Sequence, residues 1–169
     1  MTARGALFFS LCLLSACAAD PLRERKLADL GGETPGIPVG PLHRAGQPCG
    51  ECHGPEGPAD SDFALSGTLY EAPIDLAPVE NATIRFIDWT GYQYRTTSNG
   101  AGNFFVRREN YDPIWPLWVK IERSDKTVEM RSAIFRETSC GACHADPASP
   151  STAGHIYLTE AWSLRETPR

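Results

Sequence analysis

The chain of 169 residues lacks the features that define several common functional classes. Its longest apolar run, Gly5–Leu14, has ten residues, whereas a membrane-spanning helix needs about 20. No basic run exceeds two residues and the formal net charge is −5, which argues against a nucleic-acid partner. No Ser-His-Asp set, phosphate-binding glycine loop or paired-carboxylate signature occurs. Histidine is also scarce, with four residues, so the positions of these four are informative.

Half of the histidines stand in one pattern, Cys-x-x-Cys-His, which occurs at Cys49–His53 and again at Cys140–His144. This spacing is typical of c-type haem attachment, in which two cysteine sulfurs bond to the porphyrin vinyl groups. The adjacent histidine then ligates the iron. The sequence therefore predicts two covalent haem c groups, with attachment at Cys49, Cys52, Cys140 and Cys143 and with His53 and His144 as iron ligands.

Two other uses of the same four cysteines stay open. Each pair could form a local disulfide, or the two pairs together could bind zinc as a Cys₄ site. Zinc leaves both motif histidines unexplained and is uncommon in an oxidising compartment. A local redox disulfide usually lies in a thioredoxin-like βαβ context, which surrounds neither copy. Haem attachment is the favoured interpretation.

Residues 1–16 resemble a bacterial lipoprotein signal peptide. Arg4 precedes an apolar run of suitable length, and Leu14–Cys17 resembles a lipobox, in which the cysteine is acylated and becomes the first mature residue. An acyl anchor holds a protein on a membrane without a spanning helix. We therefore expect an exported protein anchored through Cys17, at the outer membrane because Ala18 follows, and facing the periplasm or the cell surface. The alternative is an ordinary export signal cut after Ala16, Ala18 or Ala19.

Between the two motifs, apolar and polar residues alternate in short runs that turn signals separate. Strands are expected over residues 63–70, 83–88, 92–97, 104–106, 116–122 and 127–130, with a turn at Asn99–Asn103. Short strands at this spacing indicate a β-sandwich. The predicted organisation is a Pro/Gly-rich tether, a first haem-binding segment, the sandwich, and a second haem-binding segment with a C-terminal tail, over residues 17–46, 47–62, 63–134 and 135–169.

Three runs in this middle block, Gly67–Tyr70, Val79–Phe86 and Thr97–Phe104, resemble the carboxypeptidase regulatory-like, transthyretin-like family. The resemblance covers about residues 63 to 132. It departs from the family pattern at Asn81, where glycine is preferred, and in the longer turn that precedes Phe104. It implies a mainly β fold, an Ig/transthyretin-like β-sandwich flanked by irregular haem-binding segments.

The whole arrangement is also similar to exported bacterial proteins with a haem motif before and after such a sandwich. In these proteins a His-x-x-Gly-Gln-Pro stretch often precedes the first motif, and His43–Pro48 matches it. This resemblance implies a haem-binding exported lipoprotein and leaves its physiological role open.

The two remaining histidines, His43 and His155, are predicted to be distal iron ligands, because two six-coordinate bis-histidine irons require four histidines in total. The alternatives are a solvated loop residue for His43 and a packing residue for His155. Met130, the only methionine besides Met1, is expected to fill the core.

These features together predict a membrane-anchored, exported dihaem c-type cytochrome that carries single electrons and is not a catalyst. Its redox partner proteins should be basic at the contact, because this chain is acidic. Two alternatives remain. One is a haem-containing sensor or binding module whose sandwich recognises a partner or a polysaccharide. The other is a haem enzyme such as a peroxidase, which requires an open iron position.

Overall fold

The computed structural model describes residues 20–145 and 149–159. The predicted signal peptide and the predicted acylation site, Cys17, lie outside the described residues. The chain divides into two units, Met1–Gly32 and Glu33–Arg169. No helix among the described residues has both the length and the apolar character needed to cross a membrane.

The described part of the first unit contains helix α2 (Pro21–Asp29). Its start follows ordinary capping chemistry, because the Asp20 carboxylate accepts from the amides of Leu22 and Arg23 and a proline begins the helix. None of its residues is buried. The structure therefore differs here from the extended tether predicted for residues 17–46.

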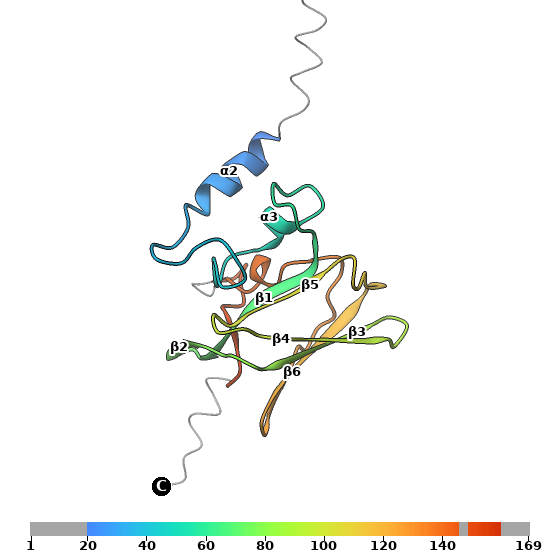
Figure 1. The fold of residues 1–169 in the computed structure, drawn as a ribbon. Coiled ribbons are helices and arrows are strands. Elements are labelled where there is room, and N and C mark those ends of the chain that lie inside the picture. Colours follow the sequence, from blue (N-terminus) through green and yellow to red (C-terminus); the bar gives the residue numbers. More distant parts are fainter. Residues whose placement is uncertain (1–19, 146–148, 160–169) are drawn as a thin grey trace, which may run out of the picture. The chain divides into compact units, whose positions relative to one another are not determined.

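The second unit is mainly β and contains two sheets (Figure 1). In the first sheet, β1 (Phe63–Ala72) is central and pairs antiparallel with β2 (Asp75–Pro78) and β5 (Asn103–Arg107). A two-residue strand, β8 (Ile156–Tyr157), pairs parallel with β1. Strand β1 therefore joins the middle of the chain to the segment that follows the second motif.

The second sheet is wholly antiparallel, with the strand order β4-β3-β6-β7. Its members are β3 (Thr83–Asp88), β4 (Gln93–Thr97), β6 (Leu117–Arg123) and β7 (Lys126–Glu129). The predicted turn at Asn99–Asn103 joins β4 to β5, and the Asn99 side chain accepts from two amides within it.

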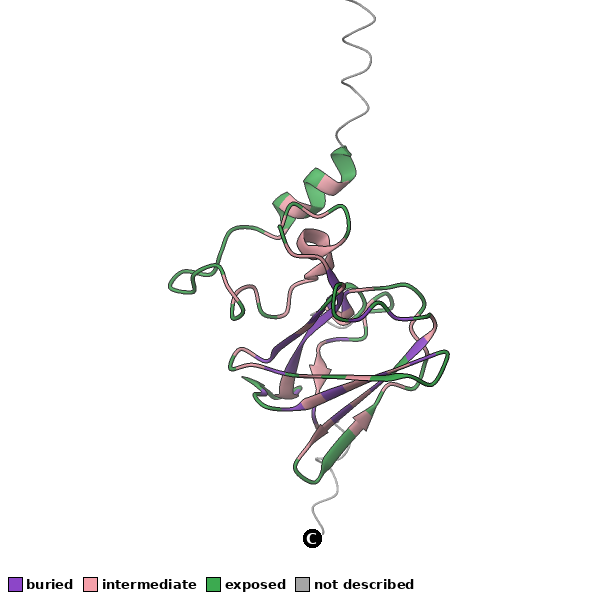
Figure 2. Cartoon of the chain, turned by 45° about the vertical axis from the view of Figure 1, so that its right-hand side comes forward, coloured by how far each residue is buried: buried purple, intermediate pink, exposed green. Residues whose placement is uncertain are grey.

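The core lies between the two sheets, and buried stretches run along strands of both (Figure 2). The core results from the alternation of residues along the strands. In β3, Ile84 and Phe86 are fully buried, whereas Thr83, Arg85 and Ile87 are partly exposed. Phe86 meets Phe104 of the other sheet, with ring centroids 6.3 Å apart. The mainly β class predicted from the sequence is confirmed, and the two packed sheets are compatible with a β-sandwich.

Candidate functional site

Each of the two Cys-x-x-Cys-His segments forms a helical turn of its own. The first is α3 (Gly50–His53), which begins after Cys49, and the second is the 3₁₀ turn η1 (Cys140–Ala142). In each, the amide of the histidine donates to the carbonyl of the first cysteine over 2.8 Å. Residues three and four apart are neighbours on a helical surface. The two thiols and the imidazole of each motif therefore come from one side of a turn, as thioether attachment with axial ligation requires.

The two motif histidines are oriented in the same way. Nδ1 of His53 lies 3.0 Å from the carbonyl oxygen and 2.8 Å from the hydroxyl oxygen of Ser61, and Nδ1 of His144 lies 3.0 Å from the carbonyl oxygen of Gly154. A carbonyl can only accept, so Nδ1 is the donor. A metal-bound histidine commonly donates its second ring nitrogen in this manner. Nε2 is thus left with its lone pair in both motifs.

An aromatic stack fixes the plane of the first imidazole. The His53 ring stacks on Phe63, with centroids 4.2 Å apart, and Phe63 stacks on Phe105 at 4.8 Å. Both phenylalanines belong to the first sheet. Strands β1 and β5 therefore hold the ring of His53, while the loop after α3 holds its Nδ1.

The first cysteine of each motif is in an apolar environment. Burial raises the pKa of the Cys140 thiol to about 12, and the same cause raises the pKa of Cys49. Zinc binding and disulfide exchange both need a thiolate, which such a site disfavours. A thioether carries no charge, so this environment suits it. In the described part, which includes all four of these cysteines, no three Cys, His, Asp or Glu side chains converge as a metal-binding group.

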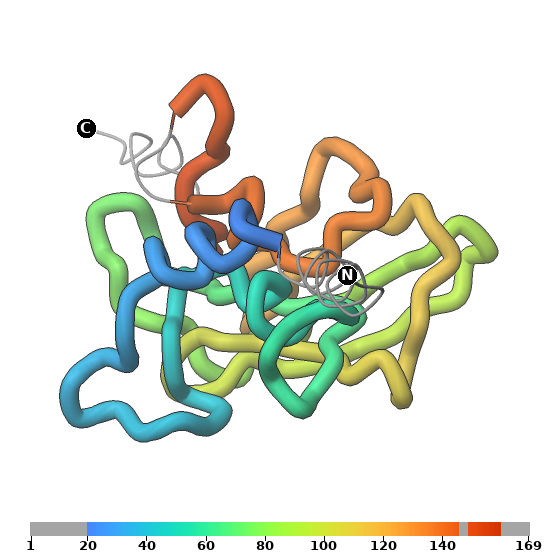
Figure 3. The backbone as a smooth tube through the Cα atoms, turned by 90° about the horizontal axis from the view of Figure 1, so that it is seen from above, coloured from blue at the N-terminus to red at the C-terminus, as the bar shows by residue number. Residues whose placement is uncertain are grey.

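The two motifs lie side by side, although about 90 residues separate them (Figure 3). A Cβ added to Gly50 would lie 3.0 Å from Cβ of Ser139, and one added to Gly141 would lie 2.9 Å from the carbonyl oxygen of Gln47 and 3.1 Å from Cα of Pro48. Each glycine thus packs on residues just before the other motif. Sequence reasoning missed this contact, and the only signal for it was a glycine after the first cysteine of both motifs.

His43 lies against the first motif. Its ring centroid is 6.0 Å from that of His53, and the two ring planes are 73° apart. Two imidazoles bound to one iron, each through a nitrogen at about 2 Å, have centroids about 6 Å apart. The separation of these two rings thus fits an axial pair on one metal.

Two buried polar side chains hold the loop that carries His43. Asn103 donates through its amide nitrogen to the carbonyl of His43 over 3.0 Å. The Asn103 amide oxygen accepts from the Thr68 hydroxyl over 2.7 Å, and that hydroxyl in turn accepts from the amide of Gly46 over 2.8 Å. Thr68 belongs to β1 and Asn103 to β5. Residues 33–46, predicted to be a tether, are therefore tied to the first sheet near His43.

His155 has different surroundings. Its ring lies 4.6 Å from that of Tyr70 and 6.3 Å from that of Tyr157, centroid to centroid. Among the described residues, no ring contact joins it to His144. The structure thus brings one predicted distal ligand to a motif histidine and packs the other on tyrosines.

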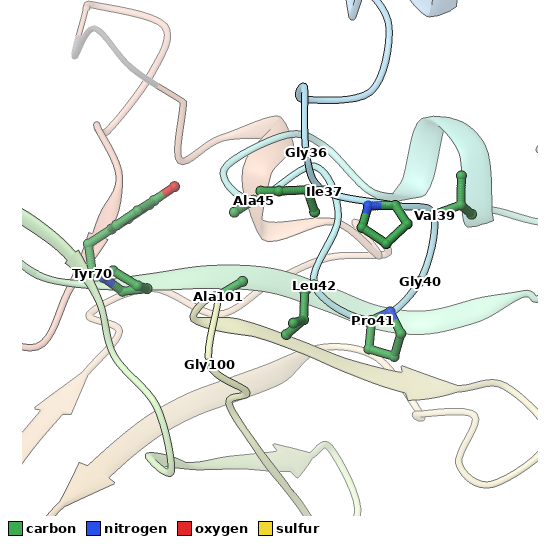
Figure 4. A pocket seen from close by; sticks show the side chains of 12 residues that line it. Gly36, Ile37, Val39, Gly40, Pro41, Leu42, Ala45, Tyr70, Gly100 and Ala101 are labelled. Carbon is green, nitrogen blue, oxygen red and sulfur yellow. The ribbon is translucent and has the colours of Figure 1, made fainter.

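An apolar cavity of about 600 Å³ lies beside the loop that carries His43 (Figure 4). Residues 36–42 and Ala45 form one wall, and Tyr70, Pro78 and Ala101 contribute to the other. Three apolar side chains of this loop, Ile37, Val39 and Leu42, are exposed.

Comparison with known proteins adds no relative: no family model, no curated protein and no solved structure matches the chain.

Proposed function

We propose that this chain is an exported, lipid-anchored dihaem c-type cytochrome that carries single electrons, built on an Ig/transthyretin-like sandwich flanked by haem-binding segments. One observation carries the proposal. Each Cys-x-x-Cys-His segment forms a helical turn, α-helical in the first and 3₁₀ in the second, with Nδ1 of its histidine facing a backbone carbonyl and Nε2 left for a metal. Two copies of this arrangement are difficult to explain by packing alone.

The residues that would hold the first haem are the thiols of Cys49 and Cys52 and the imidazoles of His53 and His43. A haem held there would accept and release one electron at its iron. The chain's own part is to orient His53 through Ser61 and Phe63, to hold the His43 loop through Asn103, and to exclude water with apolar residues. Those roles suit an electron carrier, because His53 and His43 together would leave the iron no position for a substrate.

Cys140, Cys143 and His144 would hold the second haem. For its sixth position, the predicted ligand His155 would have to leave Tyr70, on which it now packs. This observation favours one alternative function, a haem sensor in which the second iron has a position free for a small ligand. The first iron would still transfer electrons.

The test starts with stoichiometry. Protein made in a host with haem-maturation machinery should retain two covalent haems per chain after denaturation, measured as intact mass. The double variant Cys49→Ala/Cys52→Ala should lose one haem and keep the other. A wild-type mass without added haem would contradict the proposal.

Carbon monoxide then separates the two functions. The reduced protein should bind carbon monoxide at no more than one haem. Binding at neither supports the carrier, and binding at one supports the sensor. Binding at both would contradict the assignment of His43 as a ligand.

A further inference from the structure

We propose that Glu33 is a positioning residue for His43. Its carboxylate accepts a hydrogen bond from the Nδ1–H group of that ring and thereby lowers the reduction potential of the first haem. The inference rests on the proposed function, because His43 can act on a potential only as a ligand.

The first step is the contact between the two side chains. Oε2 of Glu33 lies 3.4 Å from Nδ1 of His43, longer than a good hydrogen bond. That nitrogen is buried and has no hydrogen-bond partner among the described residues. Leaving a buried polar atom unpaired is unfavourable. The carboxylate of Glu33 is an acceptor at this distance, and a shortening of a few tenths of an ångström would make it a hydrogen bond.

The second step is that Glu33 is held in place and charged. Its Oε1 accepts from Nε of Arg44 over 2.7 Å. A glutamate side chain is ionised at neutral pH, and the guanidinium of Arg44 beside it favours that ionised form. Arg44 adopts a left-handed backbone conformation, with φ at 50°, which is uncommon outside glycine. An ionised carboxylate can only accept, so it selects the Nδ1–H tautomer and leaves Nε2 of His43 for the iron.

The third step is a contrast among the histidines. Nδ1 of His53 and of His144 faces neutral oxygens, whereas Nδ1 of His43 faces a carboxylate. A carboxylate draws the Nδ1 proton more strongly and makes the imidazole a better donor. A better donor stabilises ferric over ferrous iron. The first haem should therefore have a lower reduction potential than it would have if both of its histidines donated Nδ1–H to backbone carbonyls.

The decisive variant is Glu33→Gln, which keeps an acceptor and removes the charge. Glu122→Gln is its matched control, because Glu122 also binds an arginine at 2.7 Å and is similarly exposed, 31% against 32% for Glu33. Haem content is measured first by mass. Redox titration and low-temperature electron paramagnetic resonance of the ferric protein follow.

We expect Glu33→Gln to raise the potential of one haem, to leave that of the other unchanged, and to shift the g values of one low-spin ferric signal. Glu122→Gln should change neither. Glu33→Ala, a second variant, should show the same upward shift together with a partial high-spin signal.

Three outcomes would overturn the inference. They are an unchanged potential in Glu33→Gln, an equal shift of both haems, and a shift of potential with wild-type g values, which would reduce Glu33 to a nearby charge. A wild-type protein without covalent haem would overturn the proposed function and the role of Glu33 with it.

Discussion

At the scale of single residues, the four histidines differ in what their rings contact. The sequence predicted the same role for His43 as for His155, and the same role for His53 as for His144. His53 and His144 share the Nδ1–carbonyl contact, which one motif geometry produces twice. His43 faces His53, whereas His155 packs on Tyr70. If two haems are bound as proposed, their irons should differ in axial ligation, and substitution of His43 and His155 should reveal the difference.

His43→Ala should convert one haem from low-spin to high-spin and create carbon monoxide binding at that haem, because the ring opposite His53 is lost. His155→Ala should leave the absorption spectrum unchanged, because its ring contacts tyrosines. Optical spectra of the oxidised and reduced proteins measure both. The opposite result, an altered spectrum in His155→Ala alone, would identify His155 as the sixth ligand of the second iron and would contradict the assignment of His43.

Asn103→Ala should lower the free energy of unfolding by about 1–3 kcal/mol, because the Thr68 hydroxyl and the His43 carbonyl both lose a buried partner. The loop would loosen, so part of the first haem should become high-spin. Urea denaturation and the optical spectrum measure the two effects. The exposed residue Asn110 provides the control, and Asn110→Ala should match the wild type. An unaltered spin state in Asn103→Ala would show that the loop holds His43 without this bond.

At the scale of the elements, the predicted strands succeeded where burial alternates along the chain. β3 has its predicted bounds, and β1, β4, β5, β6 and β7 fall within two residues of theirs. β2 was missed because all four of its residues are exposed and leave no alternation. β8 was missed because its two residues pair with a strand that lies far away in the sequence. Helix α2 has no buried face and therefore no apolar periodicity, so its Asp20 cap was the only sequence signal for it.

The candidate site was predictable where chemistry is local. The Cys-x-x-Cys-His pattern identifies the candidate cysteines and histidine directly from the sequence, and both copies form helical turns in the structure. The contact between Glu33 and His43 was not predictable, because a loop with no periodic pattern forms it. Nor was the reciprocal packing of Gly50 and Gly141, which depends on how β1 brings two distant segments together.

That packing leads to a prediction at the same scale. Gly141→Ala should lower the free energy of unfolding by about 1–3 kcal/mol, because the added Cβ would meet backbone atoms of Gln47 and Pro48. Gly50→Ala should cost less, since one of its two close contacts is the hydroxyl oxygen of Thr138, which can rotate away, and since alanine favours the helix.

Both glycine variants should also alter the redox titration of both haems, because each glycine touches the segment before the other motif. The matched control is Gly100→Ala, whose Cβ would make an ordinary contact with Glu80 at 3.6 Å. Urea denaturation of the holoprotein measures stability. An effect of Gly141→Ala confined to the second haem would contradict a coupled pair of motifs.

At the scale of the whole molecule, the proposed membrane location depends on Cys17, which lies outside the described residues. If it is acylated, Cys17→Ala should move the protein from the membrane fraction to the soluble periplasmic fraction, because the lipid would be the only anchor required. Fractionation with immunoblotting measures the shift, and haem content should stay at two per chain. A wild-type protein already found in the soluble fraction would favour cleavage at one of the neighbouring alanines.

Charge determines the last prediction, which concerns the partner. The chain has a formal net charge of −5, and the loop after the first motif, residues 54–62, contains three acidic residues and no basic one. Haem propionates would add to the negative charge of the protein. A basic redox protein should therefore be steered towards the first haem, and salt should weaken that steering, because the Debye length falls from about 30 Å at 0.01 M to about 8 Å at 0.15 M.

The second-order rate constant for electron exchange with a small basic redox protein should accordingly fall by about 10-fold or more over this range. Stopped-flow absorbance measures it, and an acidic redox protein of similar potential is the control, whose rate should rise with salt. The triple variant Glu56→Gln/Asp60→Asn/Asp62→Asn should flatten the dependence if the loop is the docking face. A rate constant that does not change with salt concentration would indicate that the partner binds through apolar surface instead. The exposed side chains of Val39 and Leu42 beside His43 are the nearest candidates for such a surface.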